Sequence, residues 1–298
     1  MSPGNDLQRR LENGAVVVVD GGMGTEIQAR GVAMDVEAWS AIANVTHGDV
    51  VRGIHEDYIR AGAEVVIANT FPAGAGALAA AGIAERLVEI NQAAVVLAQE
   101  ARERTGKSGV AVAGSLSDMA LSGLVSTGGD ALSDVDAFRV QAAALAEAGV
   151  DLLALEMMRS EAVAEPALRA AAETGLPVWF GVAIGGIGET GAPVSIDGTD
   201  VSRLIDLAEG RADAVMIMHT DIDVAKQALP ILRRAWAGPL GAYPHVGDWT
   251  PPNWVFGEIS PRAFAARVAP WADDGAQVLG GCCGIGPAHI AALREALA

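Results

Sequence analysis

Two adjacent cysteines, Cys282 and Cys283, are the side chains best suited to chemistry in this sequence. They are the only cysteines in the chain, so a framework of disulfides is excluded, and neighbouring cysteines rarely pair with each other because that geometry is strained. They follow a short apolar run in VLGGCCGIGPAHI (residues 278–290), where the preceding glycines allow a tight turn. The pair therefore favours thiolate chemistry or metal binding over a role as two small buried side chains.

A third ligand is needed if the cysteines hold catalytic zinc, which usually has three protein ligands and one open position. Two of the five histidines, His219 and His245, end apolar runs in AVMIMHTD and GAYPHVG. The other three lie in predicted helices or at a helix start: His47, His55 and His289. We predict that His219 completes the zinc site, and that His245 is either an alternative ligand or a residue that supports the site.

Polar side chains also end other apolar runs. Asp20 begins the segment DGGMGTE, in which the backbone N–H groups of Gly21 and Gly22 are suited to bind a carboxylate. Glu156 follows LLAL, and a buried carboxylate needs a partner. That partner is either the ammonium group of a substrate or a basic side chain such as Arg159. Two further candidates either orient a substrate or cap loops: Asn69 and Ser115.

The elements that position these residues alternate between short apolar runs and longer helical runs, eight times. The predicted strands are Ala15–Asp20, Glu64–Asn69, Val110–Gly114, Leu152–Glu156, Val178–Ala183, Ala214–Met218, Leu240–Tyr243 and Gln277–Leu279. The predicted helices lie near residues 47–61, 84–104, 132–148, 161–174, 199–208, 222–236, 261–271 and 287–297. Such alternation predicts an α/β fold, a (β/α)₈ TIM barrel with a single domain over residues 1–298.

The loops after the predicted strands are longer and richer in polar residues than those after the helices. In a (β/α)₈ barrel these strand-to-helix loops carry the active site. We therefore expect Asp20, Glu156, His219 and the two cysteines to meet at one end of the barrel.

Composition excludes several classes of protein. The net charge of −17 and the lack of a basic run argue against nucleic acid as a partner. With 51% hydrophobic residues the chain can bury a large core. No signal peptide and no apolar run of about 18 residues is present, so we expect a cytoplasmic protein without a membrane partner. Nothing in the sequence fixes the oligomeric state.

Several segments together resemble the homocysteine S-methyltransferase family. They are DGGMGTEIQARG (20–31), the pair Trp39 and Ser40, IHEDYIRAGAEVVIANTF (54–71), AGS (113–115), LLALE (152–156), the Tyr-Pro pair (243–244) and VLGGCCGIGPAHI (278–290). The resemblance implies a zinc-dependent barrel in which Cys282 and Cys283 are two zinc ligands. It also implies that Asp20 and Glu156 hold the amino group of homocysteine, with backbone contacts from Gly21 and Gly22.

This sequence departs from the family pattern at the third ligand. The family usually has a cysteine after the sixth strand, preceded by asparagine, where this chain has Met218 and His219. The segment after Glu156 is also changed, and His245 follows the Tyr-Pro pair where asparagine is frequent. Histidine is a competent zinc ligand, and a site with two cysteines and one histidine is known for catalytic zinc.

The leading hypothesis is transfer of a methyl group to homocysteine or a related small thiol. The donor is expected to be an onium compound, such as S-methylmethionine, S-adenosylmethionine or a betaine, because the leaving group is then neutral. Aromatic side chains are suited to surround that cation: Trp39, Trp249, Trp254 and Phe256. Two alternatives remain open because of His219: a metal-dependent hydrolase or lyase, and a binding barrel without metal.

Overall fold

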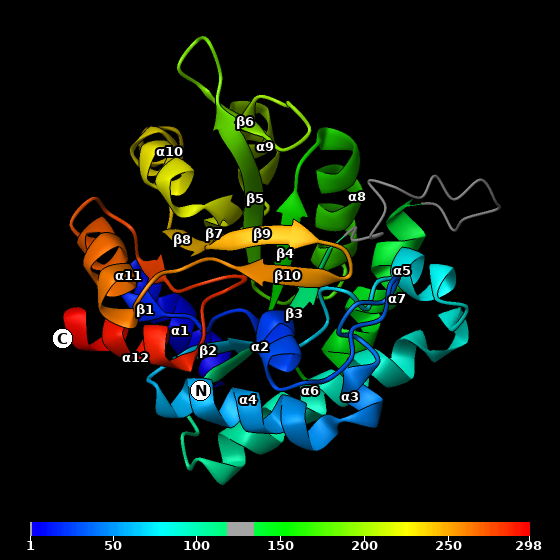
Figure 1. Cartoon of the computed structure of the whole chain (residues 1–298). Helices are drawn as coiled ribbons and strands as arrows, with labels where there is room; N and C mark the ends of the chain where they lie inside the picture. Colours follow the sequence, from blue (N-terminus) through cyan, green and yellow to red (C-terminus); the bar gives the residue numbers. More distant parts are fainter. Residues whose placement is uncertain (1, 118–133) are drawn as a thin grey trace.

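A barrel of parallel strands forms the centre of the protein (Figure 1). The structure is a computed structural model that describes residues 2–117 and 134–298. The strands are β1 (Val17–Val18), β2 (Val65–Ile67), β3 (Ala111–Leu116), β4 (Leu152–Met158), β5 (Val178–Ile187), β7 (Ala214–Asp221), β8 (Leu240–His245) and β11 (Val278–Leu279). They pair in the order β1-β11-β8-β7-β5-β4-β3-β2. A parallel bridge between Val19 and Val65 closes the sheet. The predicted (β/α)₈ barrel is confirmed.

Helices surround this barrel (Figure 1). The outer helices are α4 (Gly48–Arg60), α6 (Leu87–Arg104), α7 (Asp134–Ala148), α8 (Glu161–Ala172), α9 (Val201–Ala208), α10 (Ile222–Ala235), α11 (Pro261–Val268) and α12 (Pro287–Ala296). The starts of α9, α10 and α11 have a local cause, because Asp200, Asp221 and Ser260 accept hydrogen bonds from N–H groups of the first turn. No helix in the described parts of the chain combines the length and apolarity needed to cross a membrane.

Two apolar cores hold the layers together. The larger one lies between the strands and the outer helices, and its members are buried side chains such as Ile54, Phe180 and Phe264. The smaller one fills the barrel and includes Trp179 and Met216 together with Leu7 and Leu11. Because Leu7 and Leu11 come from α1 (Pro3–Glu12), this N-terminal helix seals the barrel at one end. Sequence analysis did not predict α1, although Ser2 and the proline after it are a normal helix start.

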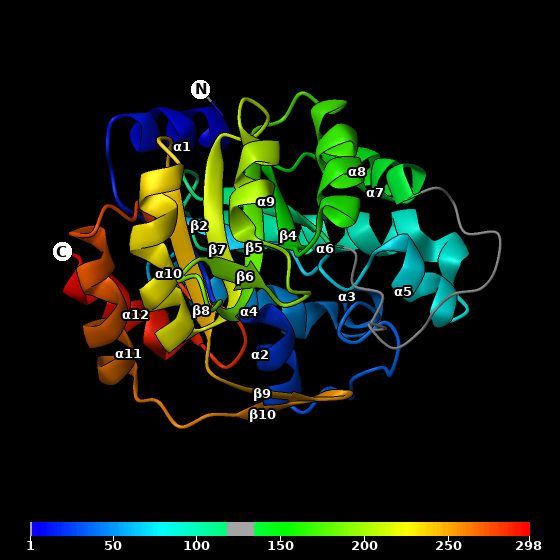
Figure 2. The same ribbon diagram turned by 90° about the horizontal axis from the view of Figure 1, so that it is seen from above.

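The other end of the barrel is covered by elements that the sequence reading treated as loops. They are α2 (Met23–Ala29), α3 (Ala43–Thr46), α5 (Ala75–Ala80), β6 (Pro193–Ser195), β9 (Gly247–Thr250) and β10 (Asn253–Phe256). Strands β9 and β10 form an antiparallel hairpin, which Figure 2 shows at the end opposite α1. Gln28 of α2 fixes this hairpin, since its side-chain amide accepts from the N–H of Trp254 at 2.7 Å and donates to the Trp254 carbonyl at 2.9 Å.

Candidate metal and substrate site

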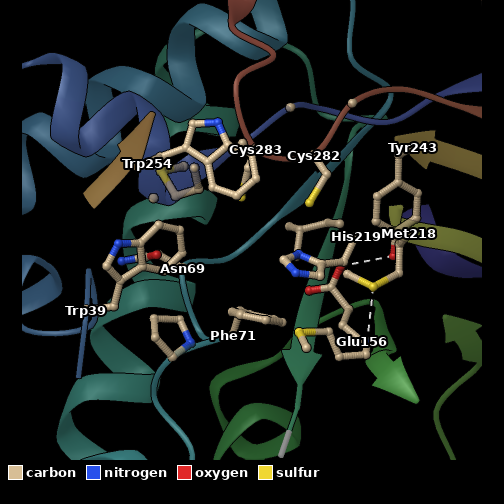
Figure 3. A pocket seen from close by; sticks show the side chains of 18 of the residues that line it. Trp39, Asn69, Phe71, Glu156, Met218, His219, Tyr243, Trp254, Cys282 and Cys283 are labelled. Carbon is tan, nitrogen blue, oxygen red and sulfur yellow. Dashed lines mark hydrogen bonds between the residues drawn. The ribbon is translucent and has the colours of Figure 1, made fainter. Parts of the chain in front are cut away.

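The ends of β7 and β11 bring together one imidazole and two thiols. The ligand atoms of His219, Cys282 and Cys283 all lie within 4.8 Å of one another. In Figure 3 the sulfur of Cys282 points toward the His219 ring. These are the three residues that the sequence analysis grouped as a zinc site, and in the described residues no aspartate or glutamate joins them.

The backbone around the site departs from regular strand geometry. The non-glycine residues with positive φ in the described chain are Trp39 (43°), Met157 (58°) and His219 (45°), and all three line the same cavity. Strain of this kind is of order 1–3 kcal/mol per residue and tends to collect at functional sites. The pairing of β4 with β5 shifts register after Leu155, and that of β7 with β8 after Met218. These irregularities turn Glu156 and His219 away from the positions that ideal strands would give them.

The cysteine turn is tied to the end of β8 by backbone hydrogen bonds. The N–H of Cys282 donates to the Pro244 carbonyl at 2.8 Å, and the N–H of Val246 donates to the Cys283 carbonyl at 3.0 Å. Gly284 has φ +80°, and a Cβ at this position would lie 2.1 Å from the Val246 carbonyl oxygen. Only glycine allows this close approach between the two loops.

The two adjacent thiols differ in acidity. A hydrogen bond from Cys283, together with the nearby His219, holds the pKa of Cys282 well below its usual value. The same hydrogen bond and burial raise the pKa of Cys283. A metal ion at this position would displace the thiol protons, because metal binding releases the protons of thiol ligands. The donor set of two sulfurs and one imidazole nitrogen suits zinc, so the residues present fit that ion.

A cavity of about 210 Å³ opens beside these ligands. One wall of the cavity is aromatic and packs against Cys283; it is formed by Trp39, Phe71, Trp249 and Trp254. Figure 3 shows Trp39, Phe71 and Trp254. The rings of Trp39 and Trp249 meet edge to face at 5.6 Å. Among the described residues no lysine or arginine lines this cavity. The cavity therefore favours cationic groups.

Glu156 supplies the negative charge of the cavity. Its carboxylate accepts hydrogen bonds from Ser115 and, at 3.0 Å, from the Tyr243 hydroxyl. Burial raises its pKa to about 7. Arg159, the basic partner considered from sequence, pairs instead with Asp197 at 3.3 Å, which leaves a ligand cation as the natural partner of Glu156. Tyr243 was missed as a site residue, although a tyrosine inside an apolar strand signals a hidden hydrogen bond.

Asp20 and Ser115 lie behind the cavity wall rather than on it. Ser115 is fully buried and donates to Glu156, so it supports that carboxylate instead of contacting a substrate directly. Asp20 accepts from the N–H of Ile67 at 2.8 Å, and burial raises its pKa well above the usual value. Repulsion from Glu156 and Cys282 raises the pKa of Asp20 further, so its ionisation is linked to theirs although it does not line the cavity.

The glycines after β1 pack tightly against the cysteine turn. A Cβ on Gly21 would lie 2.1 Å from the Ile285 carbonyl oxygen, and one on Gly22 would lie 2.9 Å from the Cα of Cys283. Both glycines line the cavity. The N–H of Gly22 donates to the Ile285 carbonyl at 3.0 Å, so this group already has a partner within the protein, and its contact with a substrate carboxylate stays a prediction.

Asn69 lines the cavity, but its amide is used within the protein. It accepts from the Ser40 hydroxyl at 2.8 Å, and donates to the Ser40 carbonyl and to Asn44, both at 2.9 Å. These bonds hold the segment that carries Trp39, whose ring lies so close to Gly24 that a Cβ there would be 2.4 Å away. Asn69 thus shapes the aromatic wall.

The profile of the family described as homocysteine S-methyltransferase matches residues 17–297. The chain belongs to the homocysteine S-methyltransferase family. A homocysteine S-methyltransferase of Escherichia coli is 31% identical over 99% of each chain, and homocysteine S-methyltransferase 4 of Zea mays is 28% identical over 96% of this chain and 90% of its own.

Solved structures of the homocysteine methyltransferase MmuM from Escherichia coli match the fold. The metallated form superimposes with a TM-score of 0.78 and the oxidized form with 0.81, each at 28% identity and over 99% of both chains. The family match and the grouping of Cys282 with Cys283 agree, so the enzyme type expected from sequence is confirmed.

The other histidines of the described chain lie outside the ligand cluster. His289 caps α12 and contacts the Ile259 carbonyl at 3.0 Å, His47 contacts Thr46, and His55 is fully buried in α4. His245 lies beside the candidate metal ligands, with its ring 5.3 Å from that of His219, and burial lowers its pKa. Phe256, expected near a bound cation, is 44% exposed on the hairpin and does not line the cavity.

Proposed function

We propose that the protein is a zinc-dependent methyltransferase that moves a methyl group from a small onium compound to homocysteine or a closely related thiol amino acid. The observation that carries this proposal is the cluster of His219, Cys282 and Cys283 facing a cavity that contains Glu156 and an aromatic wall. The family supplies the reaction type, and the cavity supplies a place for each reacting group.

The metal would be held by the three clustered residues. When bound, zinc supplies a Lewis acid that keeps the acceptor sulfur as a thiolate near neutral pH. With two thiolates and one neutral imidazole the ligands carry a charge of −2, which balances Zn²⁺, whereas three thiolates would leave a net −1. We infer that His219 tunes the site toward tighter binding of a thiolate and a lower thiolate pKa.

Glu156 would bind the ammonium group of the acceptor. Its carboxylate already has two hydroxyl donors, from Ser115 and Tyr243, which fix its orientation while leaving lone pairs free. The ammonium group would lower the pKa of Glu156 from about 7 and hold it ionised. Asp20 would add negative potential from behind, and Gly21 remains a candidate for contact with the substrate carboxylate.

The aromatic wall would bind the methyl donor. A positively charged sulfur or nitrogen is attracted to the faces of Trp39 and Trp254. The thiolate then attacks the methyl carbon, forming a carbon–sulfur bond while the donor's bond to that carbon breaks. The electron pair of the broken bond stays with the leaving group, which becomes neutral, so no proton transfer is required in this step.

The alternatives that the sequence left open receive no support from the site. A hydrolase or lyase was expected to show carboxylate ligands, and no carboxylate belongs to the described ligand cluster. A binding barrel without metal would not need a grouped imidazole and two thiols. We infer that the chain works as one barrel domain in the cytoplasm.

Metal analysis and a donor screen test the proposal. Purified, reduced protein is expected to contain one zinc per chain and to methylate homocysteine with S-methylmethionine, S-adenosylmethionine or betaine, read by mass of the product. Cys283→Ser should lose most zinc and all methyl transfer while keeping its circular dichroism, because the barrel core does not include the metal. His47→Ala, which removes an exposed histidine that is not a member of the cluster, is the control. Reduced protein that takes up no zinc, alongside a His219→Cys variant that does, would contradict the proposal.

A further inference from the structure

His245 lies where the cysteine turn, the end of β7 and the β9–β10 hairpin meet. Both of its chain neighbours are bonded to the cysteine turn: the Pro244 carbonyl accepts from Cys282, and the Val246 N–H donates to Cys283. Residue 245 is therefore held at a fixed place beside the two thiols. Its Cα also pairs with Asp221 at the end of β7, next to the irregular segment that carries His219.

The ring of His245 lies between two other rings. Its centroid is 5.3 Å from that of His219, with the ring planes at 66°, and 5.3 Å from that of Trp254, with the planes at 73°. Both are edge-to-face contacts, a favourable geometry for aromatic pairs. Trp254 is itself fixed, because its indole N–H donates to the Val246 carbonyl at 3.2 Å and its backbone is bonded to Gln28. The His245 ring thus has a rigid support on the side of Trp254.

His219 needs such support more than a ligand on a regular strand would. Its φ of +45° places it outside the strand conformation, where the ladder no longer fixes its direction. The Nδ1 atom of His245 is buried without a hydrogen-bond partner in the described residues. The ring shape of His245, rather than a hydrogen bond from that nitrogen, is therefore what the surrounding protein uses.

We propose that His245 is a positioning residue of the metal centre, whose ring holds the imidazole of His219 in the direction that ligation requires. This inference rests on the proposed metal site. It also links two departures from the family pattern, since histidine stands at both 219 and 245. A cysteine ligand at position 219 has no ring to be held, so the need for a ring at 245 arises with the histidine ligand.

A double-mutant cycle on metal binding tests the inference. His245→Asn and His245→Phe are made in the wild type and in His219→Cys, and zinc affinity is measured by competition with a chromogenic chelator. Cobalt(II) spectra of the same proteins report ligand geometry independently of activity. Circular dichroism and thermal unfolding show that each variant is folded.

In the wild-type background His245→Asn should weaken zinc binding about 10- to 100-fold, the range for residues that orient metal ligands, and should change the cobalt d–d bands. His245→Phe keeps the ring and should stay within about twofold of wild type. In His219→Cys the asparagine variant should also stay within about twofold, as independent sites do.

Equal losses in both backgrounds would overturn the inference, because they would show a general effect on the loop. Equal harm from phenylalanine and asparagine would also overturn it, since the nitrogen and not the ring would then matter. Either result leaves the zinc-dependent function standing. A wild-type protein that binds no zinc removes both the inference and the metal site of the proposed function.

Discussion

At the scale of single residues, the site concentrates groups that carry or can carry negative charge. Asp20 and Glu156 are buried, and the thiol of Cys282 is placed near both. Each of the three raises the energy of the others' ionised forms, and no lysine or arginine of the described lining offsets this. Such a cluster is relieved either by protonation of its members or by cations that bind beside it. In the proposed function these cations would be a metal ion, the ammonium group of the acceptor and the onium donor.

Acceptor binding should depend on the ionisation of Glu156. Because its pKa in the free protein is raised to about 7 by burial, the carboxyl is protonated at lower pH and cannot pair with an ammonium group. We expect kcat/KM for homocysteine to fall about tenfold per pH unit below about pH 7. In Glu156→Gln the acceptor should bind more weakly by about 1.5–3 kcal/mol, and this pH dependence should disappear. An unchanged KM in the folded variant would remove Glu156 from the acceptor site.

The same carboxyl should lower the stability of the empty protein at high pH. Its pKa rises from 4.5 to about 7 on folding, so the folded state holds the proton more tightly and stability is lost as pH rises through 7. The loss is of order 3 kcal/mol above that pH. For metal-free protein, Glu156→Gln should unfold at a higher temperature than wild type at pH 8, and this advantage should shrink toward pH 5. Glu12→Gln, at an exposed position, is the control and should show no such trend.

Site residues could be predicted from the sequence where a reactive side chain directly follows an apolar strand. Cys282, Cys283 and Glu156 follow apolar strands, so their position at the barrel mouth followed from the fold. The roles of Asn69 and Ser115 could not be predicted, because the hydrogen bonds of both side chains are made to partners that are distant in the sequence. Met157 and Met218 were not proposed as site residues at all, since their place in the cavity depends on local irregularities of the strands.

At the scale of elements, the eight strand–helix units were predictable because each strand is buried on both faces and reads as an apolar run. The β9–β10 hairpin was not. It buries Trp254 and turns Trp249 toward the cavity, while Val255 and Phe256 remain exposed, and its sequence contains the loop signal of two adjacent prolines. Its position depends on Gln28, which is 226 residues away in the chain.

Gln28 should control how the hairpin covers the cavity. Gln28→Ala removes both hydrogen bonds to the Trp254 backbone, each of which is worth about 0.5–1.5 kcal/mol. We expect faster proteolysis or hydrogen exchange in residues 247–256 and a rise in KM for the donor, because Trp249 and Trp254 form part of its wall. The matched control is Gln227→Ala, at an exposed position on α10. A hairpin equally protected in both variants would show that other contacts hold it.

At the scale of the whole molecule, the two ends of the barrel have separate tasks. The mouth holds the strained residues, the thiols and the raised carboxyl pKa values, and it is covered by the hairpin (Figure 2). The opposite end is sealed by apolar side chains of α1 that join the core inside the barrel. This division is typical of (β/α)₈ barrels, in which residues at the far end serve stability.

Leu11→Ala tests this division. Leu11 is 1% exposed and packs in the barrel interior, so its truncation should lower the free energy of unfolding by about 2–5 kcal/mol through lost burial and a residual cavity. Zinc content and kcat/KM at 25 °C should stay near wild type, because the mouth is formed by the other ends of the strands. Urea unfolding measures the first effect, and metal analysis with steady-state kinetics measures the second. Lost zinc or activity in folded Leu11→Ala protein would show that packing at the sealed end also fixes the geometry of His219 and the cysteine turn.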